Sequence, residues 1–203
     1  VNNDFDKNME DLRTFIRIRD EHANSGGNYC SVTLQMTFME MNLEQVPRVV
    51  ELAITEGVDR VKGHHLWAHF KEIKDEDMRR SKDSIERWNK IARECIEIAN
   101  NNPLPNGKRI ILANIYELDP DHGGELHPEA TCPFLGQEAW VNSEGRFDPC
   151  CSPDELRQTL GYFGNVGDEG LLNIWQSPDY QNLLENYLNF DVCKQCNMRQ
   201  LPG

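Results

Sequence analysis

The sequence predicts an α/β fold in two parts: a partial parallel βα barrel over residues 1–118, then a small α+β domain over 119–203 built around cysteine ligands. Two observations carry this prediction. Helix-like and strand-like segments alternate through the first part, which is typical of βαβ units with a parallel sheet. Four cysteines in the second part are spaced to hold an inorganic centre. Three strands are too few to close a barrel, so the first part is expected to be incomplete.

The first helix and strand are defined by the period of their apolar residues. A helix is expected over residues 5–24, where apolar side chains recur at helical spacing. Residues 31–38 alternate strictly between apolar and polar side chains, which is the period of a strand. If the apolar face packs on helices, the polar face lines the barrel interior, although a half-exposed sheet face has the same pattern. Three polar residues on this face are therefore the candidate cofactor-binding residues: Thr33, Gln35 and Thr37.

The alternation continues beyond this strand. An apolar stripe predicts a helix that Asn42 caps and Gly57 ends, and Pro47 favours a start slightly after Asn42. A strand, a helix and a strand are then expected over residues 58–64, 84–100 and 109–118. His64 and His65 end the first of these strands and point to opposite faces. We expect one of them to line the cavity and the other to be exposed.

The second part contains a hairpin, a helix and most of the cysteines. Residues 140–142 and 146–147 are strand-like and enclose the turn Ser143-Glu144-Gly145, which is typical of a hairpin. Ser177 and Pro178 fit the N-cap and the first position of a helix, and a Cys-x-x-Cys follows that helix. Four cysteines from two distant segments are the candidate metal ligands: Cys132, Cys150, Cys193 and Cys196.

Four thiolates can hold either a zinc ion or an iron–sulfur cluster, because both need soft, deprotonated sulfur ligands. The Gly145-x4-Cys spacing favours Cys150 over its neighbour Cys151, which we expect to be a packing residue or a spare ligand. Cys30 and Cys95 are expected to be small core residues, since a free cysteine behaves as a small apolar side chain.

The formal net charge of −13 argues against a nucleic-acid partner, because such proteins present basic surfaces to phosphates. No run is apolar and long enough for a bilayer, and no export signal is visible. We therefore expect a cytoplasmic protein without a membrane partner. In that compartment, paired cysteines indicate metal ligands rather than disulfides.

The cysteines belong to an ordered set of features. These are Cys132-Pro133, Trp140-Val141-Asn142, Gly145-Arg-Phe-Asp-Pro-Cys150-Cys151, Gly164-Asn165-Val166, Ile174-Trp175, Tyr180 and Cys193-x2-Cys196. The set resembles the auxiliary-cluster domain, called SPASM or Twitch, of radical S-adenosylmethionine (SAM) enzymes, and covers about residues 130–199. Residues 1–118 resemble, less specifically, the second half of the partial barrel that precedes this domain in that family.

The resemblance implies an iron–sulfur oxidoreductase. Such enzymes cleave SAM reductively to a 5′-deoxyadenosyl radical, which abstracts hydrogen from a peptide, protein or small-molecule substrate. The resemblance also implies that the four candidate cysteines hold one auxiliary [4Fe-4S] cluster that aids substrate binding or electron transfer. SAM would bind in the intact protein, beside the polar strand faces. No individual catalytic residue is assigned.

The sequence departs from the family in lacking the Cys-x3-Cys-x2-Cys loop that holds the catalytic cluster. We therefore expect the C-terminal portion of a longer enzyme, inactive by itself, with an exposed barrel edge open to homodimerisation. An alternative is a non-catalytic binding module with structural zinc in the same four cysteines, since spacing alone separates zinc from iron–sulfur poorly. A third is a peptide-recognition unit with a vestigial cluster.

Overall fold

The computed structural model describes residues 4–122 and 129–199. The chain divides into two compact units, of which the first comprises residues 1–66 and 75–124. The second comprises residues 67–74 and 125–203. The second unit therefore includes a short segment from the first half of the chain, which no pattern in the sequence indicated. The predicted division after residue 118 stays a prediction.

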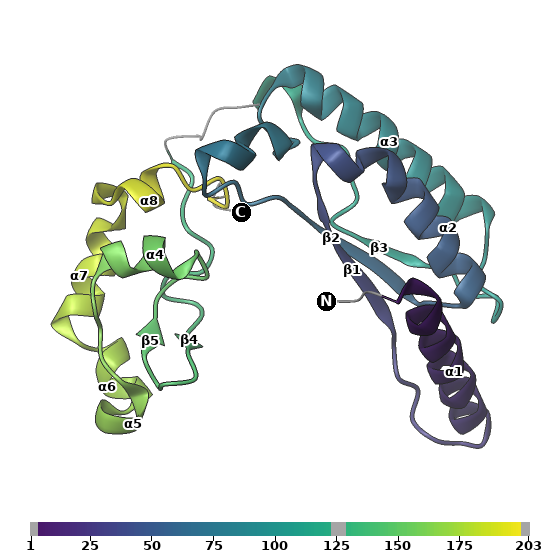
Figure 1. The fold of residues 1–203 in the computed structure, drawn as a ribbon, viewed down its shortest axis with the longest axis horizontal. Helices are drawn as coiled ribbons and strands as arrows, with labels where there is room; N and C mark the ends of the chain where they lie inside the picture. Colours follow the sequence, from purple (N-terminus) through teal and green to yellow (C-terminus); the bar gives the residue numbers. More distant parts are fainter. Residues whose placement is uncertain (1–3, 123–128, 200–203) are drawn as a thin grey trace. The chain divides into compact units, whose positions relative to one another are not determined.

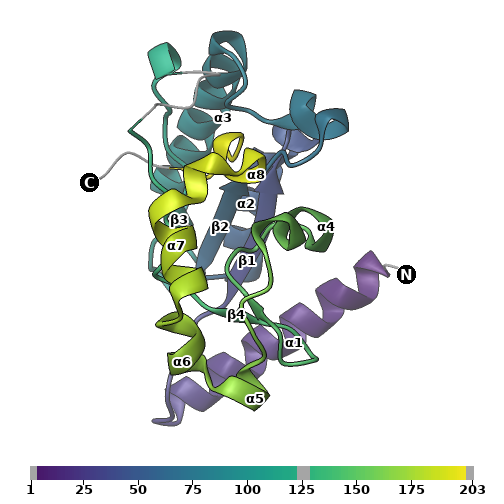
Figure 2. The same cartoon turned by 90° about the vertical axis from the view of Figure 1, so that its left-hand side faces the viewer.

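The first unit contains a parallel sheet with helices α2 (Val46–Glu56) and α3 (Lys82–Asn101) on one face (Figures 1 and 2). Its three strands lie in the order β1 (Thr33–Phe38), β2 (Arg60–His65) and β3 (Ile111–Ala113). Both strand pairs are parallel, with Thr33 opposite Arg60 and Arg60 opposite Ile111. The α/β class is confirmed. These described strands form no closed barrel, so a half-barrel remains an interpretation.

The helices of the first unit begin and end at recognisable caps. Helix α1 (Phe5–Asn24) has the predicted bounds, and the Asp4 carboxylate accepts a hydrogen bond from the Lys7 N–H. Helix α3 (Lys82–Asn101) begins at the Ser81 cap, two residues before the predicted start. None of the helices in the described part of the chain has the length and apolar composition needed to cross a membrane.

The predicted cap at Asn42 is wrong. Residues Glu40–Gln45 form a 3-10 helix, η1, and α2 (Val46–Glu56) starts only after it. Pro47 then falls in the first turn of α2, where its missing N–H costs no hydrogen bond. Gly57 ends α2 with a left-handed φ of 77°, as expected of a helix C-terminus.

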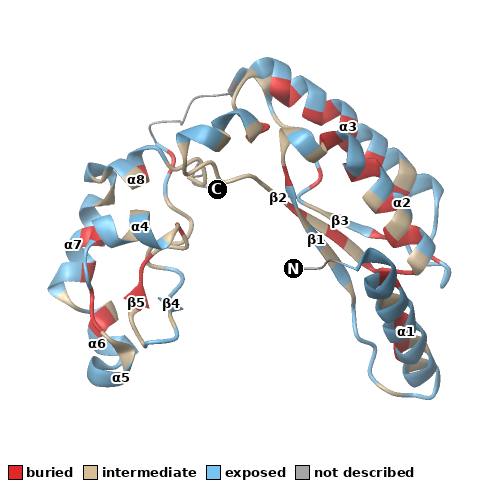
Figure 3. Cartoon of the chain, viewed as in Figure 1, coloured by how far each residue is buried: buried red, intermediate tan, exposed pale blue. Residues whose placement is uncertain are grey.

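The apolar face of β1 packs on the helices. Phe38 is fully buried, and Leu34 and Met36 pack against the same core. Trp88 lies at the centre of this core, and the buried residues of α3 lie along one side of the helix in Figure 3. The polar residues Thr33, Gln35 and Thr37 are all exposed. The predicted division of the strand into an apolar and a polar face is therefore confirmed.

Strand β3 is much shorter than the predicted strand over residues 109–118. It ends at Ala113 because Asn114 has a φ of 64°, in the left-handed region, which interrupts an extended strand. The Asn114 side-chain amide instead donates to the Gly63 carbonyl at 2.9 Å. An asparagine is one of the few non-glycine residues that adopt this conformation readily.

The expectation that one histidine lines the cavity and the other is exposed is wrong for His65. Its ring packs against Phe38 and Trp88, with centroid distances of 5.4 and 4.7 Å, on the helix side of the sheet. Both of its ring nitrogens are buried and have no hydrogen-bond partner within the described residues. Burial, with a smaller contribution from the positive charge of Arg79, lowers the pKa of His65 to about 4. His64, opposite Thr37, is partly exposed.

This burial makes stability depend on pH. The folded pKa of His65 lies below the unfolded value of about 6.5, so the unfolded state binds more protons between pH 6.5 and 4. The stabilisation is complete above pH 6.5 and decreases as the pH falls toward 4. We expect His65 alone to lower the free energy of unfolding by about 2 kcal/mol between pH 7 and 5.

Urea unfolding at the two pH values measures this effect. His65→Leu should remove that part of the pH dependence, whereas His22→Leu, which replaces an exposed histidine of α1, should leave it unchanged. Equal pH dependence in the wild type and His65→Leu would contradict the expectation.

The second unit contains the predicted hairpin, of β4 (Trp140–Val141) and β5 (Phe147–Asp148), which pair antiparallel. Its core is a cluster of buried aromatic rings around Phe147 and Tyr180, whose centroids are 5.1 Å apart. The described part of the unit also contains short helices: α4 (Asp154–Arg157), α5 (Val166–Glu169), α6 (Leu171–Trp175), α7 (Pro178–Asn186) and α8 (Asp191–Lys194). Further 3-10 helices are η2 (Lys71–Glu76), η4 (Gln158–Leu160) and η5 (Tyr187–Asn189), and the first unit has η3 (Pro120–His122).

Candidate metal centre

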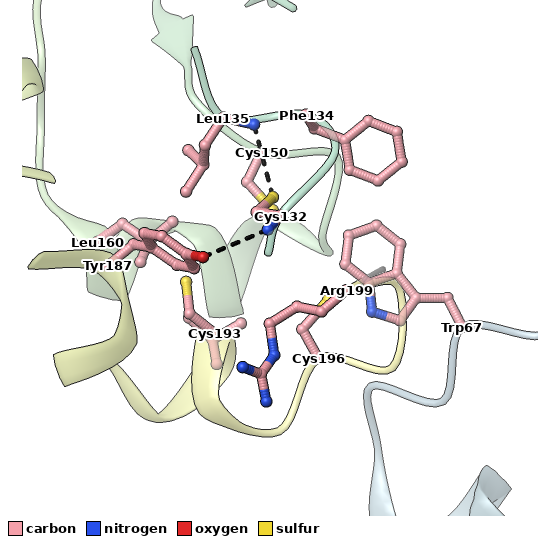
Figure 4. A pocket seen from close by; sticks show the side chains of 11 residues that line it. Trp67, Cys132, Phe134, Leu135, Cys150, Leu160, Tyr187, Cys193, Cys196 and Arg199 are labelled. Atoms are coloured by element: carbon pink, nitrogen blue, oxygen red, sulfur yellow. Dashed lines mark hydrogen bonds between the residues drawn. The ribbon is translucent and has the colours of Figure 1, made fainter. Parts of the chain in front are cut away.

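Four cysteine side chains from two distant segments line one pocket of the second unit (Figure 4). Cys132 lies before the hairpin and Cys150 just after β5. Cys193 belongs to α8, and Cys196 follows one turn later, where its N–H donates to the Cys193 carbonyl at 3.3 Å. The pocket is also lined by apolar and aromatic side chains and by one arginine: Trp67, Phe134, Leu135, Leu160, Tyr187, Val192 and Arg199.

A tight turn and an ion-pair network position Cys150. Gly145 in the hairpin turn has a φ of 84°, and a Cβ there would lie 2.6 Å from the Asn165 side-chain oxygen. Only glycine fits this position without strain. The nearly buried Asp148 of β5 accepts from Arg146 at 2.9 Å and pairs with Arg157 at 3.3 Å. The strand that leads into Cys150 is thereby held in place.

Two tyrosines of the C-terminal helices hold the loop that carries Cys132. The Tyr187 hydroxyl accepts from the Cys132 N–H at 3.3 Å (Figure 4). The Tyr180 hydroxyl accepts from the Gly136 N–H at 3.1 Å, and its ring is fully buried in the aromatic core. Through these bonds the segment before the hairpin is tied to the helices that lead to Cys193.

Backbone N–H groups point at the cysteine sulfurs. Leu135 donates to Cys132 Sγ at 3.5 Å, and Ser152 donates to Cys150 Sγ at 3.4 Å. The N–H of Met198 lowers the pKa of Cys196 in the same way. Such donors stabilise negative charge on sulfur, and they are among the features that tune the potential of iron–sulfur clusters.

Without a metal, most of these thiols hold their protons. Burial raises the pKa of Cys193 to about 12 and that of Cys196 to about 11, and it also raises the pKa of Cys132. Cys150 differs because the Cys151 thiol donates a hydrogen bond to its sulfur, which with other donors lowers the Cys150 pKa to about 6. Metal binding must therefore displace protons, so its affinity rises with pH.

The donor set fits a soft metal centre. The cavity between the side chains measures about 20 Å³, which is room for about one water molecule, so a bound cluster would widen it. Within residues 4–122 and 129–199, no group of three or more His, Cys, Asp and Glu side chains is placed to hold a metal ion as it stands. The chemistry of the four thiols, rather than a preformed ion site, is what indicates a metal centre.

The other candidate residues lie elsewhere. The role of Cys151 as a packing residue or a spare ligand stays a prediction. Cys95 is fully buried, as expected, but Cys30 is exposed rather than part of the core. The polar residues of β1 belong to the first unit, and their role in cofactor binding stays a prediction: Thr33, Gln35 and Thr37.

Sequence reasoning predicted none of the non-cysteine side chains of the pocket, among them Trp67 and Arg199. Arg199 follows the Cys-x-x-Cys by three residues, and this closeness in sequence could have indicated that it lines the same pocket. Trp67 precedes the hairpin by more than 70 residues, and nothing in its neighbourhood indicates the cysteines.

Comparison with known families agrees with this geometry. Residues 132–197 match the family model SPASM, described as an iron-sulfur cluster-binding domain. The match begins at the first of the four thiols and includes the other three, which confirms the resemblance found in the sequence. No curated protein matches the chain.

Proposed function

We propose that this chain, whose residues 132–197 match the SPASM domain, is the C-terminal part of a radical SAM iron–sulfur oxidoreductase. Its four pocket thiols would bind one auxiliary [4Fe-4S] cluster: Cys132, Cys150, Cys193 and Cys196. One observation carries the proposal, namely that these thiols line a single pocket inside the matched segment, although they come from positions up to 64 residues apart.

A zinc ion and a [4Fe-4S] cluster require different placements of the four sulfurs. A structural zinc ion requires four sulfurs at about 2.3 Å from one point. In a [4Fe-4S] cluster each cysteine binds a different iron, so the sulfurs need not converge on a point. The description of the matched family as iron-sulfur cluster-binding is what supports the cluster over zinc.

The chain's own groups would hold and shield the centre. When bound, the cluster supplies one-electron redox chemistry or a site for substrate. The N–H groups of Leu135 and Ser152 would donate to the ligating sulfurs, and the apolar wall, with Leu160 and Phe134, would keep water away. These are the contributions that a protein makes to such a centre: ligands, hydrogen bonds and a low dielectric.

The first unit is proposed to complete a radical SAM barrel in the intact protein. The helix-free face of the sheet would then line a cavity for SAM and for a peptide, protein or small-molecule substrate. The exposed residues Thr33, Gln35 and Thr37 support this, since polar side chains suit a ligand cavity better than a filled core. We further propose a cytoplasmic protein with no nucleic-acid or membrane partner, which pairs with a second copy through the sheet edge.

Anaerobic reconstitution tests the cluster. The chain is incubated with ferrous iron, sulfide and a thiol reductant, desalted, and analysed for iron, sulfide and zinc. We expect a brown protein with visible charge-transfer absorption, near-equal iron and sulfide, and an electron paramagnetic resonance signal on reduction with dithionite. Stoichiometric zinc with no retained iron, after incubation with both metals, would overturn the proposal.

A further inference from the structure

Trp67 reaches the cysteine pocket from a part of the chain remote in sequence. Residues 67–74 belong to the second unit, and the Trp67 ring stacks near Phe134, with centroids 6.2 Å apart and planes inclined by 24°. The ring lies beside Cys196 in Figure 4, and both side chains line the cysteine pocket. Two of the pocket's side chains, Phe134 and Cys196, thus lie beside one indole.

Arg199 provides a second donor and a positive charge. Its guanidinium is held by two backbone carbonyls, that of Ala130 at 3.1 Å and that of Lys194 at 3.3 Å. These bonds use the two terminal nitrogens, while Nε is buried and has no partner among the described residues. An unpaired buried N–H is costly, which indicates that an acceptor is expected in this pocket.

We propose that Trp67 and Arg199 form a cover over the auxiliary cluster that raises its reduction potential and shields it from solvent. The inference rests on the proposed function, because it assumes that a cluster binds. Reduction adds an electron to a cluster that is already negative with its four thiolates. A donated N–H and a nearby fixed cation stabilise that extra charge, so both favour the reduced state.

Trp67 also lines a second cavity. This open cavity of about 410 Å³ shares Trp67, Val192 and Cys196 with the cysteine pocket. The indole therefore lines both the candidate cluster site and a space wide enough for solvent and oxygen. Loss of the ring would join the two spaces.

Redox titration of the reconstituted full chain tests the first half of the proposal. At the wild-type midpoint potential, we expect Arg199→Gln to lower the ratio of reduced to oxidised cluster about tenfold. This corresponds to a midpoint potential that is lower by about 59 mV for a one-electron couple. Trp67→Phe keeps the ring but removes the N–H, and should lower the ratio severalfold. Arg199→Lys keeps the charge and should restore part of the loss.

Two matched variants control for charge and for tryptophan content. Arg93→Gln removes a positive charge from the first unit, and Trp140→Phe alters an exposed tryptophan of β4. Neither should move the midpoint. Iron content and circular dichroism of each variant establish that it carries the cluster and is folded.

Air exposure tests the second half. Trp67→Ala should lose its visible absorption severalfold faster than the wild type, and Trp67→Phe should resemble the wild type. A wild-type chain that binds no iron overturns the proposed function and this inference together. A loaded wild type whose potential and air lifetime are unchanged in the Trp67 and Arg199 variants overturns this inference alone.

Discussion

Replacing Cys193 with serine is expected to abolish cluster binding in the reconstituted chain. Cys193 is the most buried of the four thiols, at 8% exposure, and it lines the pocket from helix α8. Serine offers a harder oxygen that keeps its proton at neutral pH, so it cannot replace a thiolate on iron. Iron and sulfide per chain should fall to near zero, together with the visible absorption, while circular dichroism reports an unchanged fold.

The other cysteines provide internal controls for that result. Cys30→Ser alters an exposed thiol of the first unit and should leave the iron content at the wild-type level. The pair Cys150 and Cys151 is the sharper test, because their thiols are hydrogen-bonded neighbours. Cys150→Ser should lose the cluster and Cys151→Ser should retain it. The reverse outcome would show that Cys151 is the ligand and that the glycine spacing was misread.

The elements that the sequence predicted well are those whose pattern is local. Helix α1 repeats its apolar residues through five turns and has the expected bounds. The alternation in β1 identified which side chains would be buried, since one face of a strand must pack on something. The four thiols could be grouped from the sequence because their spacing is typical of a metal centre. The other residues that line the pocket could not be predicted in this way.

What could not be predicted depends on contacts between distant residues. Nothing near Trp67 indicates that its indole lies against Cys196, because the segment's membership of the second unit is a property of the folded chain. His65 was expected either to line the cavity or to be exposed, but its position on β2 turns it toward Phe38 and Trp88. The premature end of β3 follows from one backbone angle at Asn114.

A buried ion pair in the first unit is the clearest of these long-range contacts. Arg19 of α1, with 2% of its side chain exposed, donates to the Asp59 carboxylate at 2.8 Å and to the Gly57 carbonyl at 3.2 Å. The same carboxylate accepts from the Val32 N–H at 2.8 Å and from the Tyr29 hydroxyl. Burial, together with the Asp59 hydrogen bond, raises the pKa of Tyr29 to about 12. The network joins α1 to the starts of both β1 and β2.

Removing one partner of this pair should destabilise the first unit strongly. Arg19→Met leaves the Asp59 charge buried without its counter-ion, and we expect the free energy of unfolding to fall by about 3–5 kcal/mol. Arg17→Met is the matched control on the same helix, since Arg17 pairs with Glu21 at the surface, where both side chains are at least 60% exposed. Its cost should be below about 1 kcal/mol.

A double-mutant cycle separates the ion pair from the packing of the long side chain. Asp59→Asn keeps an acceptor for Val32 but removes the charge that Arg19 neutralises. The double variant Arg19→Met/Asp59→Asn should therefore cost less than the sum of the two single changes. Urea unfolding followed by circular dichroism gives the free energies, and hydrogen exchange in β1 assigns the loss to the first unit. Additive costs, or an Arg19→Met cost no larger than that of Arg17→Met, would mean that this pair is not what joins α1 to the sheet.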